Sequence, residues 1–127
     1  MAATSQRVLI VDDDRLVADT LSLIFEKGGF DSLACYSAEQ ALRQARDFHP
    51  HLLLCDVAMP GRDGIALVND ISQEFPSCRF LVLTGFQGNL NRVKQCADRI
   101  PMPVGIFTKP CQPADLLREA NAMLLNE

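Results

Sequence analysis

The sequence lacks the features that would place a protein in a membrane or outside the cell. No stretch of its 127 residues approaches the length and hydrophobicity of a transmembrane span. The apolar run at residues 8–11 is too short for the core of a signal peptide. The five cysteines are odd in number and form no CxxC pair, which argues against zinc-clip and thioredoxin-type sites. We therefore expect reduced, mostly buried thiols and a cytoplasmic location.

Other absences exclude some functions and indicate a single domain. With 16 acidic and 12 basic residues, the chain lacks the basic surface that direct binding to nucleic acid requires. It contains no GxGxxG or GxxxxGK pattern, so Gly28 and Gly29 mark a helix end rather than a phosphate loop. Repeats, low-complexity tracts and linkers are also lacking. We expect a single domain over residues 1–127, structured from about 7 to 126 and without an effector domain.

Short apolar runs alternate with amphipathic segments along the chain. The predicted strands lie at residues 7–11, 30–36, 51–55, 79–83 and 104–107. Helices are predicted at about 15–27, from 37 to 48, from 64 to near 75, at 89–98 and from 113 onward. In the first helix, Val17, Leu21 and Ile24 are expected to face the core. The alternation predicts a (βα)5 fold of the α/β class, a parallel sheet with helices on both faces.

Polar residues follow four of the predicted strands. They are Asp12, Asp13 and Asp14 after the first strand, Asp56 after the third, Thr84 at the end of the fourth, and Lys109 after the fifth. Ligands of open parallel sheets bind at this edge. Two nearby carboxylates repel each other by on the order of 4 kcal/mol at an effective dielectric constant near 20. The cluster therefore calls for a cation, and its oxygen ligands favour Mg²⁺.

A carboxylate beside a metal ion and a lysine can attack phosphorus and form an acyl phosphate. Each residue taken singly also has a plainer interpretation. The acids suit a helix start, Asp56 a turn, Thr84 a hydroxyl cap and Lys109 an exposed surface. Their coincidence at matched strand ends favours a phosphoryl site.

Four segments together carry a resemblance to a known family: residues 8–13, 56–64, 83–85 and 107–110. In order and spacing they resemble the CheY-like receiver domain of two-component response regulators over nearly the full chain. The resemblance implies a flavodoxin-like, doubly wound, five-stranded parallel sheet in the order 2-1-3-4-5. It implies a phosphorelay function, in which a sensor histidine kinase or a histidine phosphotransfer protein donates a phosphoryl group. The fourth helix, fifth strand and fifth helix would then present a changed face to a downstream effector.

The resemblance also assigns roles by position. Asp56 would be the phosphoacceptor, Thr84 would donate a hydrogen bond to the phosphoryl group, and Lys109 would pair with it. The implied ligands of Mg²⁺, or Mn²⁺, are Asp12, Asp13, Asp56 and the backbone carbonyl of Ala58. The peptide bond between Lys109 and Pro110 is often cis in this family. Catalysis would be limited to the domain's own phosphorylation and dephosphorylation, so we expect no enzyme activity on an external substrate.

The sequence departs from the family pattern in four places. Ile106 stands where a switch aromatic is usual, and the neighbouring Phe107 should point to the opposite face of its strand. Arg62 replaces a commonly apolar residue, and Gly85 replaces a frequent alanine. The segment 100–103 is proline-rich and longer than usual.

Two other functions are compatible with such a fold. A phosphorylation-independent interaction module would be marked by loss of an essential residue, and none is lost. A phosphatase of the haloacid dehalogenase type also uses a strand-ending aspartate, but Leu16 stands where that family has threonine or valine, and the chain lacks room for a cap domain. The sequence names neither the kinase nor the output.

Overall fold

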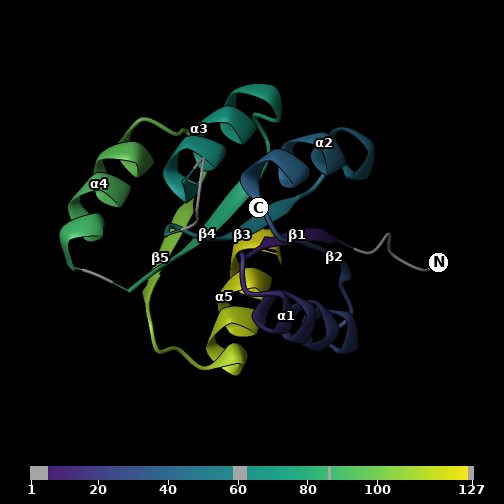
Figure 1. Ribbon diagram of the computed structural model, residues 1–127. Helices are drawn as coiled ribbons and strands as arrows, with labels where there is room; N and C mark the ends of the chain where they lie inside the picture. The colour runs from purple at the N-terminus through teal and green to yellow at the C-terminus, as the bar shows by residue number, and fades with distance from the viewer. Residues whose placement is uncertain (1–5, 59–62, 86, 126–127) are drawn as a thin grey trace.

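A computed structural model describes residues 6–58, 63–85 and 87–125. The elements are β1 (Arg7–Val11), α1 (Arg15–Lys27), β2 (Asp31–Cys35), α2 (Ala38–Phe48), β3 (Leu52–Asp56), α3 (Gly64–Glu74), β4 (Arg79–Thr84), α4 (Gln87–Asp98), β5 (Val104–Thr108) and α5 (Pro113–Leu125). The strands form one parallel sheet in the order β2-β1-β3-β4-β5. Helices α1 and α5 cover one face, and α2, α3 and α4 cover the other (Figure 1). The predicted (βα)5 fold and strand order are confirmed. Within the described ranges, no helix combines the length and the hydrophobicity needed to cross a bilayer.

Side chains cap three of the helices at their N-termini. Asp14 accepts hydrogen bonds from the first turn of α1, and Asp63 does so for α3. Ser37 accepts the Gln40 N–H at 3.1 Å. The Gln40 side chain accepts the N–H of Tyr36, one residue before the cap, at 2.9 Å. Such caps satisfy backbone donors at helix starts, and each contributes about 1 kcal/mol.

The core lies in two layers, one on each face of the sheet. Alternate residues of the central strands divide between them, so that Leu9 and Leu53 belong to the layer under α2, α3 and α4. Ile10 and Leu54 belong to the layer under α1 and α5. Both faces are covered, which explains why the strands are apolar throughout.

One predicted core face is partly wrong, because Leu21 is buried as predicted but Ala18 and Phe25 are buried in place of Val17 and Ile24. The buried residues of α1 are Ala18, Leu21 and Phe25, whereas Val17 is 37% exposed. Ala18 and Phe25 are completely buried, because the small side chain lets the helix approach the sheet and the large ring fills the space beyond it. Val17 is therefore left at the surface, near the carboxyl ends of the strands.

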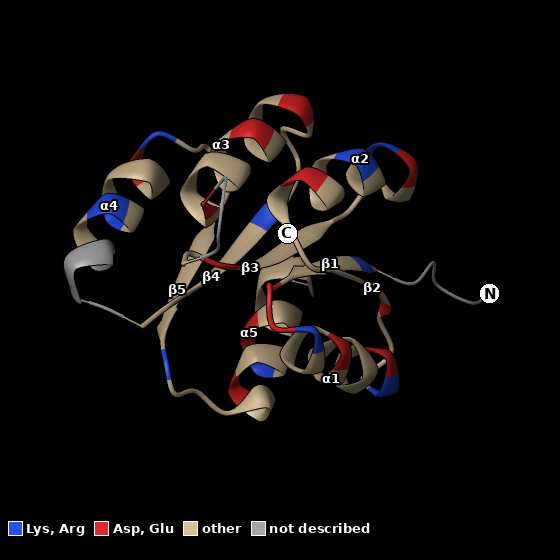
Figure 2. Cartoon of the chain, in the orientation of Figure 1, with Lys and Arg blue, Asp and Glu red and all other residues tan. Residues whose placement is uncertain are grey.

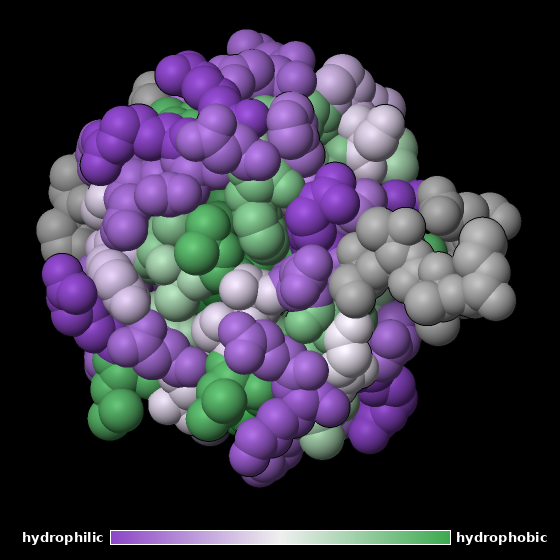
Figure 3. All heavy atoms as spheres, turned by 90° about the vertical axis from the view of Figure 1, so that its right-hand side faces the viewer, coloured by the Kyte–Doolittle hydropathy of each residue, from purple (hydrophilic) through white to green (hydrophobic). Residues whose placement is uncertain are grey.

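Charged residues lie along most of the helices, and acidic residues also lie at the β1–α1 junction and the end of β3 (Figure 2). The edge formed by β2 is different. Figure 3 shows apolar surface there, between the polar surfaces of α2 and α1. Leu33 of β2 and Leu42 and Phe48 of α2 are partly buried and pack against the core. The sheet edge is thus only partly covered by its helices.

Candidate functional site

Three carboxylates meet at the carboxyl ends of β1 and β3. Asp12, Asp13 and Asp56 each offer an oxygen, and these oxygens lie within 4.8 Å of one another. Asp12 and Asp56 are 3% and 6% exposed, whereas Asp13 is open to solvent. The neighbouring parallel strands β1 and β3 bring the acids together, because both end at the same edge of the sheet.

The surroundings of Asp12 fit a bound cation. Its Oδ1 accepts the N–H of Asp14 at 2.9 Å. Its Oδ2 is buried and accepts no hydrogen bond from the described residues. Burial raises the pKa of Asp12, and the charges of Asp56 and Asp13 raise it further, against the lowering effects of the Asp14 N–H and Lys109. A divalent ion among these oxygens would supply the missing partner and relieve the repulsion.

Both oxygens of Asp56 are hydrogen-bonded. Oδ1 accepts the N–H of Ala58 at 3.1 Å, and Oδ2 accepts from Lys109 Nζ at 2.6 Å. The same Nζ lies 4.0 Å from Asp12 Oδ2. Burial lowers the pKa of Lys109, but the hydrogen bond to Asp56 and the acidic charges outweigh it, so that the pKa lies above its ordinary value. Lys109 therefore stays charged beside the carboxylate.

Thr84 ends β4 next to these groups and is fully buried. Its carbonyl accepts the N–H of Lys109 at 2.9 Å, which fixes the β5–α5 connection against β4. The peptide bond between Lys109 and Pro110 is cis, as the resemblance implied. The structure thus brings Asp12, Asp13, Asp56, Thr84 and Lys109 to one edge, and the exposed Ala58 stands two residues after the end of β3.

The structure describes three of the four departures from the family pattern. Ile106 packs in the layer under α4, whereas Phe107 packs in the opposite layer, as predicted. Gly85 borders open space. In the segment 100–103, Ile100 is buried and Met102 packs against the core. Arg62, like residues 59–61 and 86, lies outside the described residues.

Two features around the acids were not predicted from the sequence. An apolar groove of about 650 Å³ runs between α1 and the start of α5 and reaches Gly85 and Lys109. Leu16, which lines it, is 76% exposed. The second feature is an ion pair of 2.9 Å between Asp63 and Arg92, which joins α3 to α4. An apolar residue two positions after the acidic run is a signal that could have indicated the groove, but no local signal indicates the ion pair.

Comparison with known proteins decides the family. Residues 8–121 match the family model of the response regulator receiver domain. The chain belongs to this family. It is 29% identical to the uncharacterized transcriptional regulatory protein YesN of Bacillus subtilis, over 87% of this chain and 30% of that protein. It is 38% identical over 65 residues to the DNA-binding response regulator MtrA of Mycobacterium tuberculosis, which covers 51% of this chain and 28% of that protein.

Solved structures agree with the family assignment. A CheY-like receiver domain protein from Methanospirillum hungatei is 25% identical, with a TM-score of 0.84 over 97% of this receiver domain and 96% of that chain. The matches to the curated relatives named above span 30% or less of those proteins' length. The receiver domain therefore corresponds to one part of such regulators.

Proposed function

We propose that this receiver domain is a phosphorylation switch in which Asp56 accepts a phosphoryl group. The observation that carries the proposal is the position of the Asp56 carboxylate, which binds the Lys109 ammonium group at 2.6 Å and offers an oxygen within 4.8 Å of those of Asp12 and Asp13. Few arrangements other than phosphoryl transfer use a nearly buried carboxylate beside both a cation site and a lysine. The receiver family membership supports the same function.

Asp12, Asp13, Asp56 and the Ala58 carbonyl would hold Mg²⁺ or Mn²⁺. When bound, the ion offsets charge on the transferring phosphoryl oxygens. A carboxylate oxygen of Asp56 forms the new bond to phosphorus, and the bond from phosphorus to the donor imidazole nitrogen breaks, with its electron pair leaving on the donor. Lys109 then pairs with the phosphoryl group instead of the free carboxylate, and the Thr84 hydroxyl donates a hydrogen bond to it.

The protein partners follow from this chemistry. A sensor histidine kinase or a histidine phosphotransfer protein donates the phosphoryl group, and the face of α4, β5 and α5 signals to an effector domain or protein. Residues 1–127 act as one receiver domain, in the cytoplasm and with free thiols. The domain is not an enzyme toward external substrates. A phosphorylation-independent interaction module is the alternative function.

The apolar groove beside Lys109 is the proposed contact for the phosphohistidine donor. It reaches Lys109, which binds Asp56, so a donor helix seated there would present its histidine to Asp56. Leu16→Ser should slow transfer from a phosphorylated donor protein and leave phosphorylation by acetyl phosphate unchanged. Leu23→Ser is the matched control, because Leu23 is 53% exposed on the same helix but does not line the groove. Equal rates for both variants would contradict this contact.

Acetyl phosphate tests the switch without any partner. The protein is incubated with acetyl phosphate and Mg²⁺, and its intact mass is measured. One added phosphoryl group is expected, and it should be lost in Asp56→Asn and in the presence of a chelator. If no adduct forms and beryllofluoride, a mimic of the phosphoryl group, fails to bind, the interaction module becomes the better account.

A further inference from the structure

An ion pair connects α3 to α4 close to the phosphorylation site. Arg92, in the second turn of α4, donates from Nη2 to Oδ2 of Asp63 at 2.9 Å. Oδ1 of the same carboxylate accepts the Ala66 N–H at 2.9 Å and caps α3. The Ala66 N–H and Arg92 lower the pKa of Asp63 and outweigh the opposite effect of burial, which is the largest single influence. One side chain therefore caps α3 and also binds α4.

The backbone links Asp63 to the phosphoacceptor. The N–H of Gly64 donates to the carbonyl of Val57 at 3.0 Å. A Cβ atom on Gly64 would lie only 2.3 Å from the carbonyl oxygen of Asp56, so the two backbones are in close contact. A shift of the chain around Asp56 must consequently move the start of α3 and the carboxylate that binds α4.

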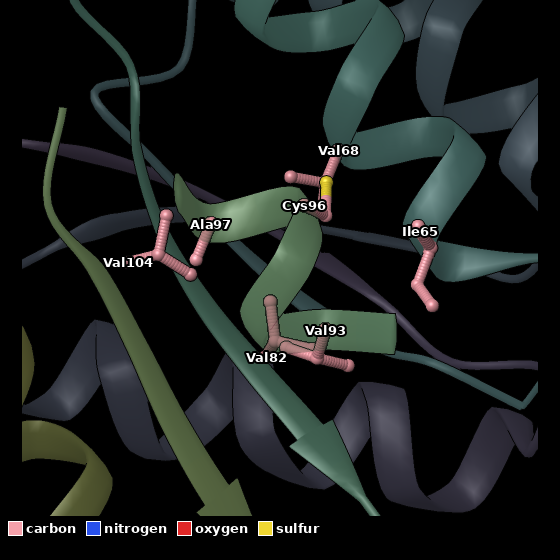
Figure 4. A pocket seen from close by; sticks show the side chains of 7 residues that line it. All are labelled: Ile65, Val68, Val82, Val93, Cys96, Ala97 and Val104. Atoms are coloured by element: carbon pink, nitrogen blue, oxygen red, sulfur yellow. The ribbon is translucent and has the colours of Figure 1, made fainter. Parts of the chain in front are cut away.

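A narrow void lies beneath α4 (Figure 4), and its lining residues Ile65 and Val93 stand within two positions of Asp63 and Arg92 in the sequence. Ile65 and Val68 of α3, Val93 and Ala97 of α4, and Val82 of β4 point toward it. It has room for about one water molecule, but its apolar lining offers water no hydrogen-bond partners. The packing of α4 is therefore incomplete where Arg92 and Val93 attach it to α3.

The void and the Thr84 side chain lie on the same face of the sheet. Val82 belongs to the core layer under α4, and Thr84, two residues later in β4, faces the same side of the sheet. Ile106 pairs with Val82 and provides no aromatic ring that could swing into space left by Thr84. Movement of Thr84 toward a phosphoryl group thus has to be taken up by another element on this face.

We propose that the Asp63–Arg92 ion pair is a latch that holds α4 in its unphosphorylated position, and that α4 moves over the void when Asp56 is phosphorylated. The inference rests on the proposed function and specifies how the site controls the α4 surface. The side chains of Arg92 and Asp63 are 55% and 34% exposed, so the latch is weak enough to be opened by a new charge nearby.

Two substitutions open the latch with little other change. Asp63→Asn keeps an oxygen to cap α3 but removes the charge, and Arg92→Met keeps the length of the side chain. Both should tighten binding of beryllofluoride with Mg²⁺ by about two- to five-fold, the value of an exposed ion pair, and should speed hydrogen exchange in α4. Val93→Ile adds one methyl group at the void and should weaken binding. Binding is measured by calorimetric titration.

Arg46→Met is the matched control. Arg46 pairs with Glu74 at 3.1 Å across α2 and α3, with the two side chains 63% and 42% exposed, and touches no residue of α4 in the described contacts. Arg46→Met should leave both the affinity for beryllofluoride and the rate of hydrogen exchange in α4 at the wild-type value. If Arg92→Met and Asp63→Asn behave like Arg46→Met, the latch is overturned while the proposed function stands. If the wild-type protein binds no beryllofluoride and takes no phosphoryl group from acetyl phosphate, the proposed function has failed, and the latch fails with it.

Discussion

Two glycines near the site should respond very differently to the same substitution. A Cβ atom on Gly64 would lie 2.3 Å from the Asp56 carbonyl oxygen, 2.9 Å from the Val57 Cα and 2.9 Å from the Cys55 Sγ. Two of these atoms are backbone atoms of the chain that carries the phosphoacceptor, so no side-chain rotation relieves the contacts. A Cβ atom on Gly85 would meet nothing within 4 Å.

The magnitudes follow from these contacts. Overpacking of this kind costs about 1–3 kcal/mol, and we expect Gly64→Ala to reach about 3 kcal/mol because the obstacle is backbone. Alanine also reduces the conformational freedom of the unfolded chain, but this stabilises the folded protein by only about 0.4–1 kcal/mol. Gly85→Ala should stay within about 0.5 kcal/mol of wild type.

Urea unfolding followed by circular dichroism measures both free energies of unfolding. Gly64→Ala should also slow phosphorylation by acetyl phosphate, since the only ways to admit the methyl group are to move α3 or the Asp56 backbone. Free energies for the two variants that agree within about 0.5 kcal/mol would refute the close contact between α3 and β3.

Further perturbations test the acids and the core. Asp12→Asn should stabilise the metal-free protein at neutral pH. Because the pKa of Asp12 is raised in the folded protein, the stability of the wild type falls as pH rises from the ordinary value of 3.8 through the raised value. The stability gained by Asp12→Asn should therefore vanish below about pH 3. Urea unfolding in the presence of a chelator measures this difference. Mg²⁺ at about one hundred times its Kd should stabilise wild type by about 2.7 kcal/mol and Asp12→Asn by less, measured as a shift in the unfolding midpoint. Phe25→Ala should cost about 3–5 kcal/mol in urea unfolding, because Phe25 is fully buried against Phe30, whereas Leu23→Ala at the surface of the same helix should change little.

Most of the fold could be predicted from short-range patterns in the sequence. The apolar strands and the caps at Asp14 and Ser37 are short-range features, and alternation of strands and helices restricts the topology to few arrangements. The acids could be placed together for the same reason, since parallel strands end at a common edge. The error in α1 arose because Val17 and Ala18 both suit a helical stripe, and which of them is buried depends on how closely the helix packs on the sheet.

Contacts between distant side chains could not be predicted. Asp63 and Arg92 are 29 positions apart, and their pairing depends on how far α4 extends past α3. The groove beside Lys109 depends on the distance between α1 and the β5–α5 connection, which no local pattern encodes.

The position of the phosphoryl group distinguishes Asp56 from its acidic neighbours as the phosphoacceptor. Protein treated with acetyl phosphate and Mg²⁺ is reduced with borohydride, which converts an aspartyl phosphate to homoserine, and the peptides are then sequenced by mass spectrometry. We expect homoserine at residue 56 and at no other aspartate. Homoserine at Asp12 or Asp13, or none at all despite a mass shift in the intact protein, would contradict it.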